Sequence, residues 1–81
     1  MKYTKAIGIR LGELLRERKI TQKALAEQCQ ISRVTINRTI KGHVKAVTFE
    51  TLLAVCMVLK ISWKDFFDVD IFEISNLERD D

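Results

Sequence analysis

The chain has 81 residues, of which 47% are hydrophobic and 31% charged, and its formal net charge is +3. This length suits one small domain, and a chain with three glycines and no proline is neither collagen-like nor of low complexity. The longest apolar run, residues 52–59, is too short to cross a membrane, and the first residues lack the apolar core of a signal peptide. We therefore expect a cytoplasmic protein with no membrane partner.

Positive charge is concentrated in the first part of the chain. Residues 1–45 contain eleven Lys and Arg against three Asp and Glu, a balance of +8. Residues 46–81 contain three basic and eight acidic residues, a balance of −5. Such an asymmetry indicates a polyanionic partner for the basic part, although charged faces are also commonly just solvated.

Apolar side chains recur at helical spacing in residues 6–18 and predict a first helix. Its buried stripe comprises Ile7, Leu11, Leu14 and Leu15. Its opposite, solvent-facing side comprises Arg10, Glu13, Arg16 and Glu17. Gly8 and Gly12 weaken this helix but allow close backbone packing.

Two short helices are predicted next, separated by a polar break at residues 30–31. Thr21 caps the first of them, which ends near Cys29. Ser32 caps the second, which runs to Lys41 with a buried seam at Ile36 and Ile40. Gly42 follows as a left-handed helix stop.

The fourth helix is predicted to begin after Thr48, and it is apolar nearly all round, which favours a place at the centre of the core. A fifth helix begins at Ser62, where Asp65 completes the pattern of a capping box. Its apolar face comprises Trp63, Phe66 and Phe67. In the acidic tail, residues 68–81, we expect an extended strand at Val69, Ile71 and Ile74 and a frayed end over the last five residues.

No pattern of catalytic or metal-binding residues occurs. Nothing matches a nucleophile elbow, a phosphate loop or a spaced set of metal ligands, and His43 has no close ligand partner. Cys29 and Cys56 lie on apolar stripes and are expected to be buried thiols, with a disulfide between them left open. We predict no enzyme, no metal and no cofactor.

The stretch "TQKALAEQCQISRVTINRTIKG", Thr21 to Gly42, has the form of a helix-turn-helix. It resembles the helix-turn-helix of the phage repressor and Cro family, the xenobiotic-response-element type of bacterial regulators. The matching residues are Gln22, Leu25, Ala26, Ile31, Ser32, Thr35, Ile36, Arg38 and Gly42. The likeness continues through "TFETLLAVCMVLKISWKDFF" and covers roughly residues 6–67. It implies an all-α, five-helix, lambda-repressor-like DNA-binding domain over residues 1–67, followed by the tail.

Three features depart from the family pattern. Gln30 stands where the family usually has a turn glycine, and a left-handed residue there would cost about 1 kcal/mol. Thr39 stands where an apolar residue is common, so we expect Ile40 to take over part of that packing. The loop "GHVKAV" lacks the usual proline and is one residue longer.

The resemblance implies that the helix at residues 33–41 enters the major groove of double-stranded DNA. The positions that match the family's base-facing sites are Ser32, Arg33, Val34, Asn37 and Arg38. The resemblance also places Gln22 at a phosphate. Further phosphate candidates, chosen because cations and hydroxyls bind phosphate without reading sequence, are Lys23, Thr35, Lys41, His43 and Lys45.

The predicted function is that of a sequence-specific transcriptional regulator, a repressor in our reading, that occupies an operator. The alternative is a protein-interaction module or antitoxin-like partner on the same fold. Two arginines on the third helix speak against that alternative. RNA binding is weaker still, because no aromatic stacking surface is evident.

A homodimer is expected, because one recognition helix reads only a few base pairs and a two-fold pair places two such helices about 34 Å apart. The predicted dimer contact lies in the tail, at Val69, Ile71, Phe72 and Ile74. The opposing expectation is that these side chains fold back onto their own helices. The chain would then be a monomer that pairs only on DNA.

Overall fold

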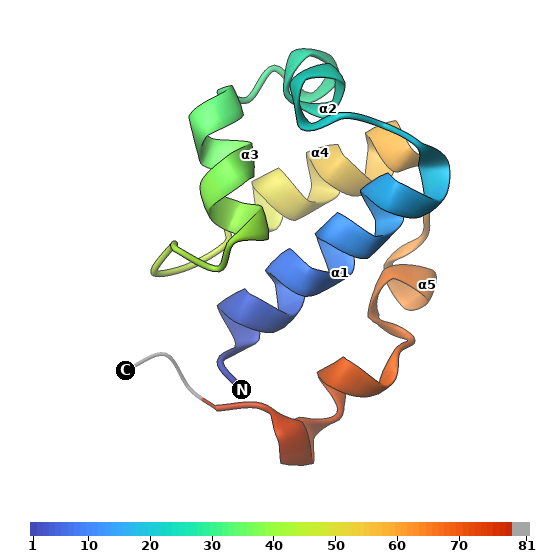
Figure 1. Cartoon of the computed structure of the whole chain (residues 1–81). Helices are drawn as coiled ribbons and strands as arrows, with labels where there is room; N and C mark the ends of the chain where they lie inside the picture. The colour runs from blue at the N-terminus through green and yellow to red at the C-terminus, as the bar shows by residue number, and fades with distance from the viewer. Residues whose placement is uncertain (79–81) are drawn as a thin grey trace.

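The computed structural model describes residues 1–78, which form five α-helices followed by two short 3-10 helices (Figure 1). The elements in chain order are α1 (Tyr3–Arg18), α2 (Gln22–Cys29), α3 (Arg33–Ile40), α4 (Phe49–Leu59), α5 (Trp63–Phe67), η1 (Asp70–Phe72) and η2 (Ile74–Asn76). The expected all-α, five-helix architecture is confirmed. None of the helices within residues 1–78 combines the length and apolarity that a membrane crossing requires.

Hydroxyl side chains begin four of the helices, as the sequence predicts. Thr21, Ser32, Thr48 and Ser62 each accept a hydrogen bond from the backbone N–H three residues later, at 3.0–3.1 Å. Each bond satisfies one N–H that has no partner inside its helix. The helix starts are therefore set by local sequence.

Left-handed residues end several helices. Gln30 has φ 58° and Gly42 has φ 73°, so both expected left-handed positions are confirmed. Lys19 and Lys60 adopt the same conformation, at φ 55° and 54°. A residue with a Cβ costs about 1 kcal/mol or more in this region, so three of these four stops carry a modest strain.

The core forms around α1, with α3 on one side and α5 on the other (Figure 1). Phe66, Leu25, Ile36 and Val55 are at most 1% exposed, and they bring α5, α2, α3 and α4 into one cluster. Gly8 lets α3 approach the backbone of α1, because a Cβ there would clash with the carbonyl oxygens of Thr39 and Ile40. The orientation of α3 therefore depends on a backbone-to-backbone contact.

The buried side of α3 differs from the expected seam of Ile36 and Ile40. Ile36 is fully buried, but its partner is Thr39 at 3% exposure, while Ile40 is half-buried. The Thr39 hydroxyl donates to the Thr35 carbonyl oxygen at 2.8 Å, so its burial leaves no unpaired donor. A small side chain suits this position because α3 lies so close to Gly8.

Arg10 does not face solvent, contrary to the expectation from helical periodicity. It is 9% exposed, and its Nε and Nη2 donate to the carbonyl oxygens of Phe66 and Asp65, each at 2.8 Å. Its Nη1 lies 3.8 Å from Glu13. The C-terminal carbonyls of a helix lack partners within that helix, and Arg10 satisfies two of them while joining α1 to α5.

The helix that the sequence favoured at the centre of the core, α4, contributes only one of its sides to it. Its inner side buries Leu52, Val55, Cys56 and Leu59. Its outer side leaves Phe49, Leu53 and Met57 exposed at 65%, 41% and 69%. A helix that is apolar on every side is buried only where other elements pack against it. Within the described residues, the core covers one side of α4.

The tail also differs from its expected extended strand, because Val69, Ile71 and Ile74 lie in or beside 3-10 helices. Phe72 packs against the core, with its ring centroid 4.8 Å from that of Phe67 and 6.1 Å from that of Phe66. Ile74 is 83% exposed. Folding back onto the chain's own helices is thus observed for Phe72, and a role of the tail in dimerisation stays a prediction.

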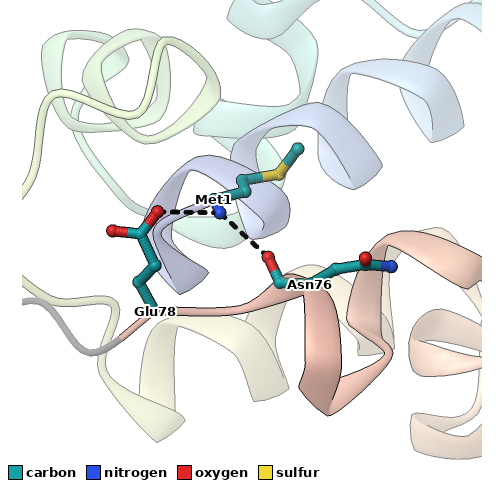
Figure 2. A network of polar contacts seen from close by, with 3 residues as sticks. All are labelled: Met1, Asn76 and Glu78. Carbon is teal, nitrogen blue, oxygen red and sulfur yellow. Dashed lines mark hydrogen bonds and ion pairs between the residues drawn. The ribbon is translucent and has the colours of Figure 1, made fainter.

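The end of the described tail returns to the start of the chain (Figure 2). The Met1 ammonium donates to the Asn76 carbonyl oxygen at 2.9 Å and lies 3.1 Å from a carboxylate oxygen of Glu78. The Glu78 N–H in turn donates to the Met1 carbonyl oxygen at 2.7 Å. The expected fraying therefore does not extend to residues 77 and 78, and the rest of that expectation lies outside the described residues.

Candidate DNA interface

The turn between α2 and α3 holds the two helices at a defined angle. Gln30 N–H donates to Glu27 O at 3.3 Å and Ile31 N–H donates to Ala26 O at 3.1 Å, so the backbone of the turn is bonded to the end of α2. The half-buried Ile31 packs against the core. Because α3 also packs against both α1 and α2, it is presented as a rigid ridge (Figure 1).

The outward side of α3 gathers most of the predicted base-reading residues. At 100° per residue, Val34, Asn37, Arg38 and Lys41 lie on the side opposite the buried Ile36. Val34 is 61% exposed, and Ser32, Arg33 and Arg38 are exposed as well. Asn37 is half-buried. Four of the five predicted base-reading side chains are thus exposed, and Val34, Asn37 and Arg38 share the outward side of α3, while Arg33 lies at its flank beside Ile40.

Asn37 is held in place by Gln22. Its Nδ2 donates to the Gln22 Oε1 at 3.1 Å, which joins a predicted base-reading residue to a predicted phosphate contact on the neighbouring helix. The bond leaves Asn37 its Oδ1 and one N–H, the two groups that pair with adenine. It also leaves the Gln22 NH2 group as a donor for a phosphate oxygen.

Ser32 and Thr35 form a second polar pair. The Ser32 Oγ accepts from the Thr35 N–H at 3.1 Å and donates to the Thr35 Oγ1 at 2.8 Å. With the Ser32 hydrogen used in this way, the Thr35 hydroxyl hydrogen remains to donate outward. This arrangement suits Thr35 as a phosphate contact better than it suits Ser32 as a base reader.

The remaining predicted phosphate contacts lie on α2 and on the segment that follows α3. Lys23 is exposed on the first turn of α2. Lys41 and His43 continue from α3, with their N–H groups bonded to Asn37 O and Arg38 O at 3.0 and 2.9 Å. Lys45 is exposed farther along the loop that leads to α4, so the structure does not bring it to α3 as directly.

Arg16 and Lys19 lie near Gln22, although the sequence pattern did not single them out. Together with Gln22 they line a groove of about 450 Å³ between the end of α1 and the start of α2. Helical periodicity placed Arg16 on a solvated face. The signal that could have identified Lys19 is its position two residues before the Thr21 cap, because a cation there comes close to the start of the next helix.

The cysteines take no part in this surface. Both are free thiols, with Cys56 buried and Cys29 half-buried. Burial raises the pKa of each thiol above its ordinary value, so both stay protonated and unreactive at neutral pH. Within residues 1–78, no three His, Cys, Asp or Glu side chains gather in a way that would hold a metal ion.

Comparison with known proteins places this geometry in a family. A family model described as a Cro/C1-type helix-turn-helix DNA-binding domain matches residues 10–70, which include α2, α3, α4 and α5. No curated protein and no solved structure matches the chain significantly. The family match covers most of the chain and includes the rigid α2–α3 unit with its exposed polar surface. The chain belongs to the Cro/C1-type family of helix-turn-helix DNA-binding domains.

Proposed function

We propose that this DNA-binding domain reads an operator by placing α3 in the major groove and represses transcription from the adjacent promoter. The observation that carries the proposal is the exposure of Arg33, Arg38 and Val34 on a helix that buries Ile36 and Thr39 in the core. The major groove is wide enough for a helix, and such a helix must be held rigidly if it is to read base edges.

The side chains on this surface match the hydrogen-bonding groups of base pairs. An arginine can donate two hydrogen bonds to O6 and N7 of guanine, and an asparagine can pair with adenine through its amide. Val34 offers a methyl contact to thymine. Since Gln22 already orients Asn37, less conformational entropy would be lost when that side chain meets a base.

The cations around α3 would bind the DNA backbone and fix the register. Those proposed from the sequence are Lys23, Lys41, His43 and Lys45, beside the donors of Gln22 and Thr35. Arg16 and Lys19 add two further charges next to Gln22. Such contacts make affinity fall steeply with salt whatever the DNA sequence, whereas the contacts of α3 would give preference for one sequence.

Repression needs no further activity, because a protein that occupies a promoter blocks access to it. The alternative, a protein-interaction module or antitoxin-like partner, would favour apolar or acidic residues on the open side of α3. The open side of α3 instead holds Arg33 and Arg38. We further propose that the protein acts in the cytoplasm as a homodimer, which doubles the length of DNA that is read.

Selection of bound sequences from a random pool of duplex DNA tests this function. We expect an enriched motif, and titration of that motif should show that Arg38→Ala and Arg33→Ala each weaken binding by about 1–3 kcal/mol. Lys64→Ala serves as the control, because it removes an exposed cation on α5. Recovery of no motif, or unchanged affinity in both arginine variants, would remove α3 from the reading role.

A further inference from the structure

The outer side of α4 carries a stripe of large apolar side chains, Phe49, Leu53 and Met57, spaced four residues apart. Aromatic rings of α5 extend it. The centroids of Phe49 and Trp63 lie 4.9 Å apart, and those of Trp63 and Phe67 lie 5.8 Å apart. We call these five side chains the apolar face. It shares no residue with the polar surface of α3.

The size of the apolar face is that of an interface centre. Single exposed apolar residues are ordinary, but a contiguous patch of several hundred Å² marks an interaction site. The exposed fractions of these side chains correspond to roughly 450 Å² if a large side chain offers about 200 Å². A stable dimer buries about 800 Å² on each partner, and this area includes a polar rim around the apolar centre. The apolar face has the area of such a centre.

We propose that a second copy of this chain covers the apolar face, with the two α4 helices packed antiparallel about a two-fold axis at Leu53. This inference rests on the proposed function, since it assigns the contact that pairs two reading helices. In a two-fold contact, if one residue of the first copy meets another residue of the second copy, the same two residues also meet with the copies exchanged. The spacing fits, because Phe49 and Met57 lie equally far on either side of Leu53, about 6 Å along the helix axis.

A groove beside the stripe supplies the complementary shape. Leu53, Met57 and Trp63 are among the residues that line this open groove of about 380 Å³. The antiparallel arrangement brings Phe49 of the second copy to Met57, at the mouth of the groove. Each Phe49, which is 65% exposed in the single chain, would thereby enter the groove of the other copy.

Charge complementarity favours the same arrangement. Glu50 lies in the first turn of α4 and Lys60 follows its last residue, and both are exposed on the side of α4 that carries Leu53. With Leu53 on the axis, Lys60 of the second copy comes within about one helical turn of Glu50. The pair forms twice by symmetry, at the rim of the apolar centre. A parallel arrangement would instead bring the like charges together.

The tail offers less surface for the same purpose. Phe72 is already packed on Phe66 and Phe67, and Val69 and Ile71 are half-buried. Ile74 is the strongly exposed apolar residue of the tail, at 83%. One such side chain is an ordinary surface feature, so we assign the contact to the apolar face and keep the tail as the competing outcome.

Sedimentation of the full chain without DNA tests the assignment. Met57→Lys should weaken dimerisation about tenfold or more, because it places a charge in the apolar centre, while Ile74→Lys should leave it unchanged. Both side chains are more than two-thirds exposed, so neither variant should alter the thermal unfolding midpoint of the monomer, measured at a concentration so low that the parent is also monomeric. A monomeric parent at about 10 μM, or a Met57→Lys variant that dimerises like the parent, would overturn the proposal. Loss of the dimer in Ile74→Lys alone would assign the contact to the tail.

A charge exchange tests the antiparallel orientation. Glu50→Lys and Lys60→Glu should each weaken the homodimer, whereas a mixture of the two variants should form a heterodimer more tightly than either variant pairs with itself. No preference for the mixed pair would overturn this geometry. The proposed function and the proposed dimer contact can fail separately. Arg38→Ala should still dimerise but should lose its preference for a DNA sequence. Met57→Lys should lose the dimer but keep its preference for the DNA sequence of a half-site.

Discussion

The open sides of α3 and α4 differ in chemistry although the two helices are built alike. Each begins at a hydroxyl cap, at Ser32 or Thr48, and buries one side in the same core. The open side of α3 is polar and positively charged, whereas that of α4 is apolar. Since the local structure is shared, the difference lies in what each side can bind, a polyanion for α3 and another apolar surface for α4.

The two helices also differ in how firmly their open sides are supported. The side chains of α3 that we propose to face the bases stand on a backbone that contacts α1 at Gly8, and Asn37 is bonded to Gln22. Hydrogen bonding to base edges tolerates displacements of only about 0.5 Å. Apolar contact at α4 depends on area and shape and tolerates larger ones. We therefore expect changes in the support of α3 to have the greater effect.

The largest effect is expected from Gly8→Ala. The added Cβ would clash with the Thr39 carbonyl oxygen and lie 2.6 Å from that of Ile40, so the α1 and α3 backbones would have to separate. We expect a loss of about 3 kcal/mol or more in the free energy of unfolding, measured by urea denaturation. DNA binding should weaken as well, since α3 would be displaced.

Gly12→Ala is the matched control for this change. A Cβ at Gly12 would lie 3.6 Å from a methyl group of Ile40, an ordinary contact. Alanine also favours a helix over glycine by about 1 kcal/mol, so this variant should be as stable as the parent or more so. Equal effects of the two substitutions would contradict the close approach at Gly8.

The second largest effect is expected from Arg10→Met, which changes the contact between α1 and α5. It removes both donors from the carbonyl oxygens of Phe66 and Asp65, and we expect a loss of about 2–3 kcal/mol in the free energy of unfolding. Amide hydrogen exchange should rise in α5 more than in α3. Arg10→Lys, which keeps the charge with fewer directed donors, should fall between Met and the parent. If Arg10→Met has the same free energy of unfolding as the parent, hydrogen bonds from water satisfy these carbonyl oxygens as well as the arginine does.

Local signals in the sequence account for the helix starts and for the α2–α3 unit. Thr21, Ser32 and Gly42 act on backbone groups within a few residues of themselves, so their effects can be predicted from neighbouring residues alone. For the same reason the exposed positions of α3 were predictable, since they follow from one buried residue, Ile36, and the helical repeat.

Features that depend on neighbours distant in the chain were not predictable in this way. Periodicity shows which residues share a side of a helix, but not how many sides are covered. It therefore placed Arg10 in solvent and α4 at the centre of the core, and it could not find the Asn37–Gln22 hydrogen bond. The tail was expected to be extended at Val69, Ile71 and Ile74, whereas Phe72 packs on α5 and the segment forms two 3-10 helices.

A smaller effect is expected at the bond between Asn37 and Gln22. Gln22→Ala and Asn37→Ala should each weaken operator binding, and the double variant should lose less than the sum by roughly 0.5–1.5 kcal/mol. The reason is that either change alone already frees the other side chain. Lys45 has no bond to Gln22, so the pair Gln22→Ala and Lys45→Ala should be additive. Additive losses at Gln22 and Asn37 would mean that each side chain contacts DNA without help from the other.

The smallest effects compare two left-handed residues, one on each side of the molecule. Gln30 precedes α3 and Lys60 follows α4, and their φ angles of 58° and 54° are nearly equal. Replacement by glycine relieves about 1 kcal/mol of strain, partly offset by the greater freedom of glycine in the unfolded chain. We expect both variants to gain a few tenths of a kcal/mol in the free energy of unfolding.

The two glycine variants should nevertheless differ in association. Gln30→Gly leaves the apolar face unchanged and should dimerise like the parent, whereas Lys60→Gly removes the charge proposed to face Glu50 of the second copy and should dimerise less tightly. Lys60→Arg, which keeps the charge, should dimerise like the parent. Sedimentation equilibrium beside urea denaturation measures both properties on the same samples. If the two variants gain equal stability and also dimerise equally, the backbone comparison holds but Lys60 has no part in the contact between α4 helices.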